Sequence, residues 1–319
     1  MRLATIDLGT NTVRLLVAES PRPPAWRLVH HEQQVTRLGE GLWPDRVLRD
    51  APMTRTAAAV AAYVERARAL GADVVRIAAT SAVREALNGP AYAARLEAAT
   101  GVAVEVVSGE DEARLTIRGV RGALGGVRGA LGGVSGTLLV FDIGGGSTEY
   151  ILARGRDVVA SVSLHLGVVR LAERFPFPDP VEPARYQAME DEVAAQLARE
   201  LPPAITGARI DHLVGTAGTV TALAAIDLGL TTYDGDRVQG HRLDRDTVRG
   251  QLARLGALTV RQRAAVPCLE PGRADLIVPG IAIVLATMRT LSAPALVVSD
   301  AGLREGMMSE AVARLAGEA

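Results

Sequence analysis

Lysine is absent from the sequence, and all 35 of its basic residues are arginine. A Walker A phosphate loop is therefore excluded, because that loop depends on a lysine side chain. Any cationic side chain that binds an oxyanion in this protein must be a guanidinium. A guanidinium binds oxyanions in a bidentate manner and stays charged at every relevant pH.

Cysteine and long apolar runs are also scarce. The single cysteine, Cys268, excludes an intrachain disulfide and a cysteine metal cluster, and we expect its thiol to be half-buried and inert. The most apolar run, residues 276–285, is interrupted by Pro279 and Gly280 and is too short to span a bilayer. A charge occurs within the first seven residues, too early for a signal peptide. We therefore expect a cytoplasmic protein with no membrane partner.

An excess of charge of either sign is missing as well. The formal net charge is −1 at pH 7, which argues against a general nucleic-acid partner and still permits a locally basic cleft. Hydrophobic residues make up 48% of the 319 residues and aromatic residues only 3%, so we expect a core of alanine, valine and leucine. At roughly 100–200 residues per domain, this length predicts two domains.

A glycine-rich turn between two apolar segments is the most informative feature that is present. Residues 137–141 and 150–152 are predicted as strands, with Asp142 before the turn and Glu149 after it. Three glycines let the backbone approach a ligand closely, and a concavity of N–H groups and hydroxyls suits phosphate oxygens. The two acids would repel a bare phosphate, so they imply a divalent cation or a water beside it. An ordinary glycine-rich hairpin is the alternative. The predicted phosphate-binding residues of this turn are Gly144, Gly145, Gly146, Ser147 and Thr148.

The N-terminus repeats this pattern in outline. Residues 3–6 are predicted as a strand, Asp7 follows, and residues 13–18 are predicted as a second strand. The two aspartates are 142 − 7 = 135 residues apart, which predicts two related lobes that face a shared cleft. Arg14 lies among apolar residues, where an unpaired charge is costly, so it is either an edge charge or an anion ligand. The other polar and glycine residues of this turn are Gly9, Thr10 and Asn11.

Two further strand ends carry candidate residues. The predicted strand at 74–79 leads into a helix that contains Arg84, and open α/β sheets bind ligands at such ends. A structural charge pair with Glu85 is the alternative role of Arg84. The predicted strand at 102–107 leads into a helix with an acidic first turn, in which Glu112 is placed to act as a general base. The remaining acids of that turn are expected to complement the helix dipole.

A third turn and an internal repeat complete the pattern. The third turn opens a predicted helix, whose N–H groups are suited to an anion; its residues are Gly215, Thr216, Gly218 and Thr219. Residues 120–126 are repeated at 127–133, and a third copy begins at 134–136. So much glycine disfavours a helix, so we expect an exposed loop between the lobes with no chemistry of its own. Further helices are predicted at 52–70, 186–201, 248–258, 276–291 and from 305 to about 315.

Taken together, eight segments resemble, in order, the exopolyphosphatase / guanosine pentaphosphate phosphatase (Ppx/GppA) family of the actin, sugar kinase and Hsp70 superfamily. The segments are 7–14, 79–88, 108–115, 141–149, 166–173, 215–221, 272–280 and 299–306. The resemblance implies an α/β fold of two ribonuclease H-like (actin-like ATPase) lobes with an active-site cleft between them. It also implies the short form of the family, without an appended HD-type domain. The implied boundaries are 1–119 for the N-terminal lobe, 120–136 for the segment between the lobes and 137–304 for the C-terminal lobe, with a helix at about 305–319 that packs back on the first lobe.

The resemblance also implies roles for individual residues. Glu112 matches the family's catalytic glutamate, which orients or deprotonates the attacking water, and Asp142 matches a residue assigned to catalysis. Asp142 and Glu149 match residues assigned to Mg²⁺ or another divalent cation. As a hypothesis, we add Asp7 as a ligand through a water. Three arginines match those that bind phosphates: Arg14, Arg84 and Arg273.

We predict a magnesium-dependent exopolyphosphatase that releases terminal orthophosphate from inorganic polyphosphate by water attack. The alternative is a pppGpp 5′-phosphohydrolase, which would use the same loops and the same glutamate. A kinase of the superfamily would need an adenosine pocket, for which residues 215–221 are suitably placed, and an acceptor base. A non-catalytic binder of polyphosphate or guanosine tetraphosphate would gain nothing from Glu112, Asp142 and Glu149. Family members are often homodimers, but the sequence shows no interface pattern.

Overall fold

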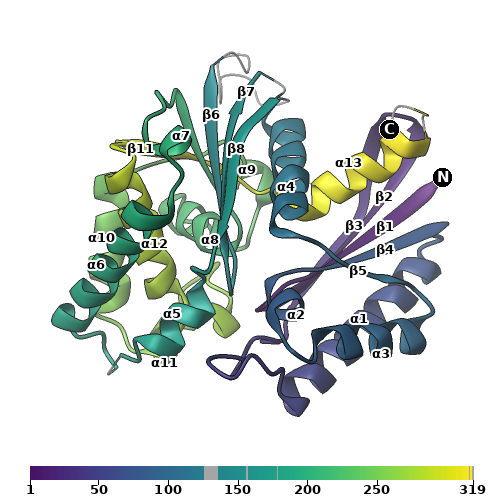
Figure 1. The fold of residues 1–319 in the computed structure, drawn as a ribbon, viewed down its shortest axis with the longest axis horizontal. Helices are drawn as coiled ribbons and strands as arrows, with labels where there is room; N and C mark the ends of the chain where they lie inside the picture. The colour runs from purple at the N-terminus through teal and green to yellow at the C-terminus, as the bar shows by residue number, and fades with distance from the viewer. Residues whose placement is uncertain (126–135, 156, 178, 316, 318–319) are drawn as a thin grey trace. The chain divides into compact units, whose positions relative to one another are not determined.

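The computed structural model describes residues 1–319 except 126–135, 156, 178, 316 and 318–319. The chain forms two compact units, and each has its own sheet (Figure 1). The first unit consists of Met1–Gly122 and Gly302–Ala319, and the second consists of Ala123–Ala301.

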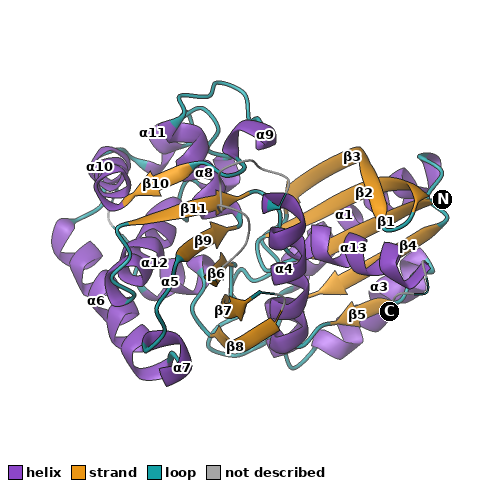
Figure 2. Cartoon of the chain, turned by 90° about the horizontal axis from the view of Figure 1, so that it is seen from above, coloured by secondary structure: helices purple, strands orange, loops and turns teal. Residues whose placement is uncertain are grey.

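The first unit is built on a five-stranded sheet with the strand order β3-β2-β1-β4-β5 (Figure 2). Its central strand β1 pairs antiparallel with β2 and parallel with β4, and β2–β3 and β4–β5 continue these directions. The central strand β1 is buried from Leu3 to Leu8, whereas the edge strand β5 is largely exposed. The strands are β1 (Arg2–Leu8), β2 (Thr12–Arg22), β3 (Ala25–Val35), β4 (Val74–Ala79) and β5 (Val104–Val106).

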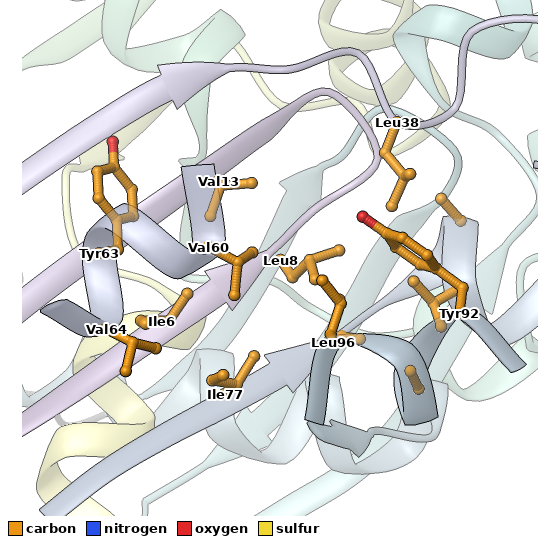
Figure 3. Packing of buried hydrophobic residues seen from close by; sticks show 14 of the residues in the cluster. Ile6, Leu8, Val13, Leu38, Val60, Tyr63, Val64, Ile77, Tyr92 and Leu96 are labelled. Carbon is orange, nitrogen blue, oxygen red and sulfur yellow. The ribbon is translucent and has the colours of Figure 1, made fainter. Parts of the chain in front are cut away.

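Helices cover both faces of this sheet. Alternate side chains of β1 therefore pack against different helices. Ile6 and Leu8 point into the core that α1 and α3 close, together with Val60 and Leu96 (Figure 3). Leu3 points to the other face and packs against Met308, Ala311 and Val312 of α13. Asp7 is on the α13 face, because it is four residues from Leu3. The helices are α1 (Asp50–Ala69), α2 (Ser81–Glu85), α3 (Gly89–Thr100), α4 (Gly109–Leu124) and α13 (Leu303–Leu315).

The second unit repeats the sheet of the first with one strand added. Its order is β10-β11-β9-β6-β7-β8, in which β8-β7-β6-β9-β11 have the same pairing directions as β3-β2-β1-β4-β5. Strand β10 is added antiparallel at the edge. The strands are β6 (Thr137–Ile143), β7 (Thr148–Arg154), β8 (Asp157–Leu164), β9 (His212–Thr216), β10 (Arg242–Asp244) and β11 (Ala295–Ser299).

The helices of the second unit include α12, in which every residue from Ile277 to Met288 is buried. Such a helix belongs to a protein core, and no helix in the described part of the chain is long and apolar enough to cross a membrane. The remaining helices are α5 (Val168–Arg174), α6 (Pro183–Glu200), α7 (Pro203–Thr206), α8 (Gly218–Asp227), α9 (Gly235–Val238), α10 (Arg245–Gly256), α11 (Val260–Arg263), the 3₁₀ turn η1 (Pro271–Arg273) and α12 (Ile277–Thr290).

The likeness of the two sheets extends to a single residue position. The β2–β3 register shifts between Val17 and Ala18, and the β7–β8 register shifts between Leu152 and Ala153. Each shift begins ten residues after the aspartate of its unit, since 17 − 7 = 10 and 152 − 142 = 10. A β-bulge at the same place in both hairpins supports the sequence-based prediction of two related lobes.

One secondary-structure prediction is wrong. Helix α4 continues to Leu124 and so includes most of the first repeat copy, which we expected to be a loop. Val120 and Leu124 are four residues apart and fully buried, so they lie on one apolar face of the helix. Packing of that face outweighs the weak helix propensity of the glycines, as it commonly does in proteins. The second copy and the start of the third lie almost entirely outside the described residues.

Candidate active site

The turn between β1 and β2 has no room for a side chain at Gly9. The Gly9 N–H donates to the Thr12 carbonyl at 3.1 Å, and a Cβ atom on Gly9 would lie 2.9 Å from that same oxygen. The turn between β6 and β7 closes in the same way: the Gly144 N–H donates to the Ser147 carbonyl at 2.9 Å, and a Cβ on Gly144 would lie 3.0 Å from it. The two turns predicted from the sequence therefore share their geometry.

In the first unit, Asp7 and Arg14 lie directly opposite each other on β1 and β2. Arg14 Nη1 is 3.4 Å from Asp7 Oδ2, so Arg14 is paired within its own sheet. Burial raises the pKa of Asp7, while the charges of Arg14 and Arg304 act to lower this pKa and that of Glu305 acts to raise it. Ionised Asp7 is therefore a buried charge that the surrounding groups only partly compensate.

No role was predicted for Arg304 or Glu305, although both lie in the segment 299–306 that resembles the family. Arg304 Nε is 2.8 Å from Glu305 Oε1, and Arg304 Nη1 donates to the Leu15 carbonyl at 3.4 Å. Thr5 Oγ1 donates to the Arg304 carbonyl at 3.2 Å, which fixes the start of α13 on β1. No local pattern could have placed them beside Asp7, because about three hundred residues separate them (304 − 7 = 297).

The candidate base Glu112 is held by an arginine. It lies in the first turn of α4 with only 8% of its surface exposed, and Arg84 Nη1 is 2.8 Å from its Oε2 atom. Arg84 Nη1 also donates to the Val107 carbonyl at 2.9 Å. Glu85, the alternative partner of Arg84, instead accepts a hydrogen bond from Ser81 Oγ at 2.7 Å. The structure thus brings Arg84 and Glu112 together, and a charge-assisted hydrogen bond fixes the orientation of the carboxylate.

In the second unit, Asp142 and Glu149 lie directly opposite each other on β6 and β7. Glu149 is 1% exposed, and its Oε1 atom accepts hydrogen bonds from Ser147 Oγ at 2.8 Å and Ser163 Oγ at 2.6 Å. Asp142 is partly exposed. Ser163 was not predicted as a site residue; it faces Glu149 because β8 pairs with β7 in this register.

The donor set around this turn suits a hard cation. Mg²⁺ is usually bound through one or two carboxylates, with waters and substrate phosphates as the other ligands. Across the described residues, no group of three or more His, Cys, Asp or Glu side chains could hold a metal ion by itself. Asp142 and Glu149 are carboxylates of the type that bind Mg²⁺ together with substrate phosphates, and they remain a predicted pair of ligands. Asp7, the third predicted ligand, belongs to the first unit.

The first residues of α5 donate backbone hydrogen bonds to carbonyl groups of the turn between β6 and β7. The Val168 N–H donates to the Gly144 carbonyl at 3.1 Å and the Val169 N–H donates to the Gly145 carbonyl at 2.9 Å. Thr148 Oγ1 donates to the Leu166 carbonyl at 2.5 Å, so its hydroxyl hydrogen is used inside the fold. Gly167 has no room for a side chain, because its Cβ would lie 2.2 Å from the Gly145 oxygen.

The third predicted turn joins β9 to α8, and Arg273 lies against it. A Cβ on Gly218 would lie 1.1 Å from Arg273 Nη1, so the absence of a side chain leaves the space that this guanidinium occupies. Arg273 Nε donates to Glu270 at 2.9 Å. Thr216 Oγ1 donates to the Ala301 carbonyl at 3.0 Å and is buried, and a Cβ on Gly280 would collide with Thr219. The structure thus brings Arg273 to the N-terminus of α8, where an anion is favoured.

Cys268 behaves as the sequence indicates. It is partly buried, its Sγ atom is 3.2 Å from the Leu230 carbonyl, and burial raises the pKa of the thiol. A thiol of raised pKa is a poor nucleophile.

Comparison with known proteins identifies the family. The model of the Ppx/GppA phosphatase family matches residues 17–315, which is nearly the whole chain. The chain belongs to the Ppx/GppA phosphatase family. This confirms the resemblance found in the sequence and the prediction of an enzyme, a phosphoanhydride hydrolase. The predicted α/β fold with two ribonuclease H-like (actin-like) lobes is confirmed as well, since solved members of the Ppx/GppA family share it.

Individual relatives agree with this membership. The chain is 36% identical over 304 residues to exopolyphosphatase 2 of Mycobacterium tuberculosis, with 91% of each protein covered. The crystal structure of the Aquifex aeolicus Ppx/GppA family member is 28% identical, with a TM-score of 0.80 and coverage of 99% of this chain and 98% of that one. An exopolyphosphatase from Cytophaga hutchinsonii is 26% identical, with a TM-score of 0.86 and 98% of both chains covered.

Proposed function

We propose that this Ppx/GppA protein is a magnesium-dependent exopolyphosphatase that releases orthophosphate from the end of inorganic polyphosphate. The observation that carries the proposal is the buried Glu112 carboxylate, which Arg84 orients through a 2.8 Å hydrogen bond. The names of the relatives support polyphosphate as the substrate, because the proteins from Mycobacterium tuberculosis and Cytophaga hutchinsonii are both described as exopolyphosphatases.

In the proposed reaction, a water oriented by Glu112 attacks the terminal phosphorus atom. A new P–O bond forms as the bond to the bridging oxygen breaks, the shortened chain leaves as an oxyanion, and Glu112 takes the proton of the water. Phosphoryl transfer of this kind depends mainly on positioning and electrostatics. The N–H groups of Gly145 and Gly146, together with Arg84 and Arg273, would bind phosphate oxygens and neutralise their charge.

Asp142 and Glu149 would hold Mg²⁺, which supplies positive charge for the phosphate oxygens. Glu149 has its Oε1 atom in two hydrogen bonds, so its orientation is fixed before any metal binds. Asp142, being partly exposed, is the more accessible of the two. Asp7 would contribute through a water.

The second candidate is hydrolysis of pppGpp to ppGpp at the 5′ end. It is favoured by one observation, the family itself, whose model covers both Ppx and GppA proteins. The same glutamate and the same glycine turns would serve this reaction.

A side-by-side assay decides between the two substrates. Purified protein is given long-chain polyphosphate or pppGpp, with Mg²⁺ or with EDTA, and released orthophosphate is measured. We expect Mg²⁺-dependent release with a higher kcat/KM for polyphosphate. A higher kcat/KM for pppGpp would establish the second candidate. Full activity in EDTA would refute the proposed metal requirement, and no release from either substrate would refute the proposed function.

A further inference from the structure

We propose that Arg37 and Arg170 are two further phosphate-binding residues, one for each glycine turn. This inference rests on the proposed function, because it assigns them the phosphates of the same polyanionic substrate. Neither residue was among the predicted site residues.

The two arginines occupy similar places in the two units. After β3 in the first unit, the chain crosses the Gly9–Thr12 turn: the Thr36 and Arg37 N–H groups both donate to the Asn11 carbonyl, at 3.0 and 2.9 Å. After β8 in the second unit, the Val169 and Arg170 N–H groups both donate to the Gly145 carbonyl, at 2.9 and 3.4 Å. In each case, a pair of adjacent backbone donors shares one turn carbonyl, and the second donor belongs to an arginine.

These hydrogen bonds change what the turns present to an anion. A free backbone carbonyl carries partial negative charge and would repel a phosphate, and here the carbonyls are already paired with N–H donors. In the first unit, the Gly39 N–H also donates to the Thr10 carbonyl, at 2.8 Å. The side-chain atoms Thr10 Oγ1 and Asn11 Oδ1 are buried and have no hydrogen-bond partner within the described structure. A buried polar group without a partner is costly, and a bound ligand or water would remove the cost.

Arg37 is held rigidly on the first turn. Its neighbours Thr36 and Leu38 are completely buried, and Leu38 packs into the core with Leu8 and Tyr92 (Figure 3). Arg37 itself has a φ of 52°, a left-handed conformation that is unfavourable for any residue with a Cβ. Strain of this kind is often found at functional sites. Glycine would adopt this conformation without strain, and the sequence places a cation there instead.

Each phosphate of a polyphosphate chain is negatively charged, so further cations beside the two turns would favour its binding. The predicted arginines Arg14, Arg84 and Arg273 each pair with a carboxylate, of Asp7, Glu112 and Glu270 respectively. These acids offset part of the positive charge, and the sequence has no lysine to add to it. Both Arg37 and Arg170 are partly exposed and fixed at their Cα atoms within a few ångströms of a turn. From these positions, a guanidinium that reaches the turn would bind phosphate oxygens in a bidentate manner.

The test separates a binding role from a structural one. Arg37→Gly removes the guanidinium, keeps the backbone N–H that donates to Asn11 and relieves the left-handed strain. Arg37→Gln and Arg170→Gln remove the charge and keep the N–H groups. Arg209→Gln is the matched control, because the Arg209 side chain is 94% exposed and contacts neither turn. Two quantities are measured at low and high salt: the Kd for long-chain polyphosphate in EDTA, and kcat/KM for phosphate release with Mg²⁺.

We expect each of the three test variants to weaken polyphosphate binding and to lower kcat/KM by about tenfold, which corresponds to one lost hydrogen-bonded contact to a charged group. We also expect a smaller effect of salt than in the wild type, because one screened charge pair is gone. The control should match the wild type in every respect.

Kd and kcat/KM values within twofold of the wild type would overturn the inference for that arginine. A loss of binding that accompanies a lower Tm, with the salt dependence of the wild type, would also overturn it, because the role would then be structural. If the wild type binds polyphosphate but releases no phosphate, the proposed function fails, while the Kd values still decide the inference.

Discussion

At the scale of single residues, the sequence identified acids and arginines as candidate site residues. It did not predict which acid pairs with which arginine. Arg84 was expected either to bind an anion or to pair with Glu85, and it pairs with Glu112. These two residues are 112 − 84 = 28 positions apart, and they meet because β4 and β5 are adjacent parallel strands whose C-terminal ends lie together. Sequence patterns indicate which residues are neighbours along one helix or strand. The contact between Arg84 and Glu112 depends instead on the order of the strands in the sheet, which these patterns do not reveal.

Asp7 leads to a prediction about stability. Burial raises its pKa in the folded protein above the value in the unfolded chain, so ionisation of Asp7 costs stability. This cost is absent well below the unfolded pKa of about 3.8, grows as pH rises through the folded pKa, and is then constant. We therefore expect Asp7→Asn to raise the Tm at pH 7–8 and to lose this advantage towards pH 4, while phosphate release falls sharply.

The measurement is the Tm of both proteins across this pH range. Asp246→Asn is the matched control, because the Asp246 side chain is 93% exposed and its removal should change the Tm little at any pH. A lower Tm for Asp7→Asn at pH 7–8 would show that the ion pair with Arg14 outweighs the cost of burial.

At the scale of helices and strands, most of the prediction from sequence is confirmed. The strands at both glycine turns and the helices at α1, α6, α10, α12 and α13 lie where apolar periodicity placed them, within a few residues. Helix α4 was predicted too short, because a local propensity argument cannot include the burial of Val120 and Leu124. Close backbone contacts were also missed. Gly167 carries no local signal of its contact with Gly145, since the contact forms only when α5 reaches the turn between β6 and β7.

Gly167 is therefore a site for a stability test of the second turn. In Gly167→Ala, the new Cβ would lie 2.2 Å from the Gly145 oxygen and 2.4 Å from the Gly146 nitrogen, and only backbone movement can relieve the overlap. Overpacking of this kind costs about 1–3 kcal/mol, so we expect a lower unfolding midpoint in urea and weaker phosphate release, because the phosphate turn must shift.

Gly250→Ala provides the comparison. Gly250 is an exposed residue inside α10 with nothing within 4 Å of an added Cβ, and alanine is favoured over glycine there by about 0.5–1 kcal/mol. We expect a slightly higher unfolding midpoint and unchanged activity. Equal midpoints for the two variants would contradict the proposed contact between Gly167 and the turn.

At the scale of the whole molecule, the sequence indicated two related lobes. It did not indicate that the two lobes also share their strand order and a register shift. Two aspartate–glycine turns 135 residues apart predicted two related lobes. The structure adds five strands in the same order in both units and a register shift at the same distance from each aspartate. Strand order depends on long-range pairing, which a short motif does not encode. The contribution of α13 to the first unit likewise requires the chain to return after nearly two hundred residues.

The central claim is that Glu112 orients the attacking water in a phosphoanhydride hydrolase. The most direct test compares the wild type, Glu112→Gln and Glu110→Gln in Mg²⁺-dependent phosphate release from long-chain polyphosphate. Glu110 lies in the same turn of α4 but is exposed, so Glu110→Gln should keep the activity of the wild type. We predict that Glu112→Gln keeps its Tm and its affinity for polyphosphate while kcat falls by about 10²–10⁴, the usual contribution of a general base. A kcat of Glu112→Gln close to that of the wild type would contradict the account.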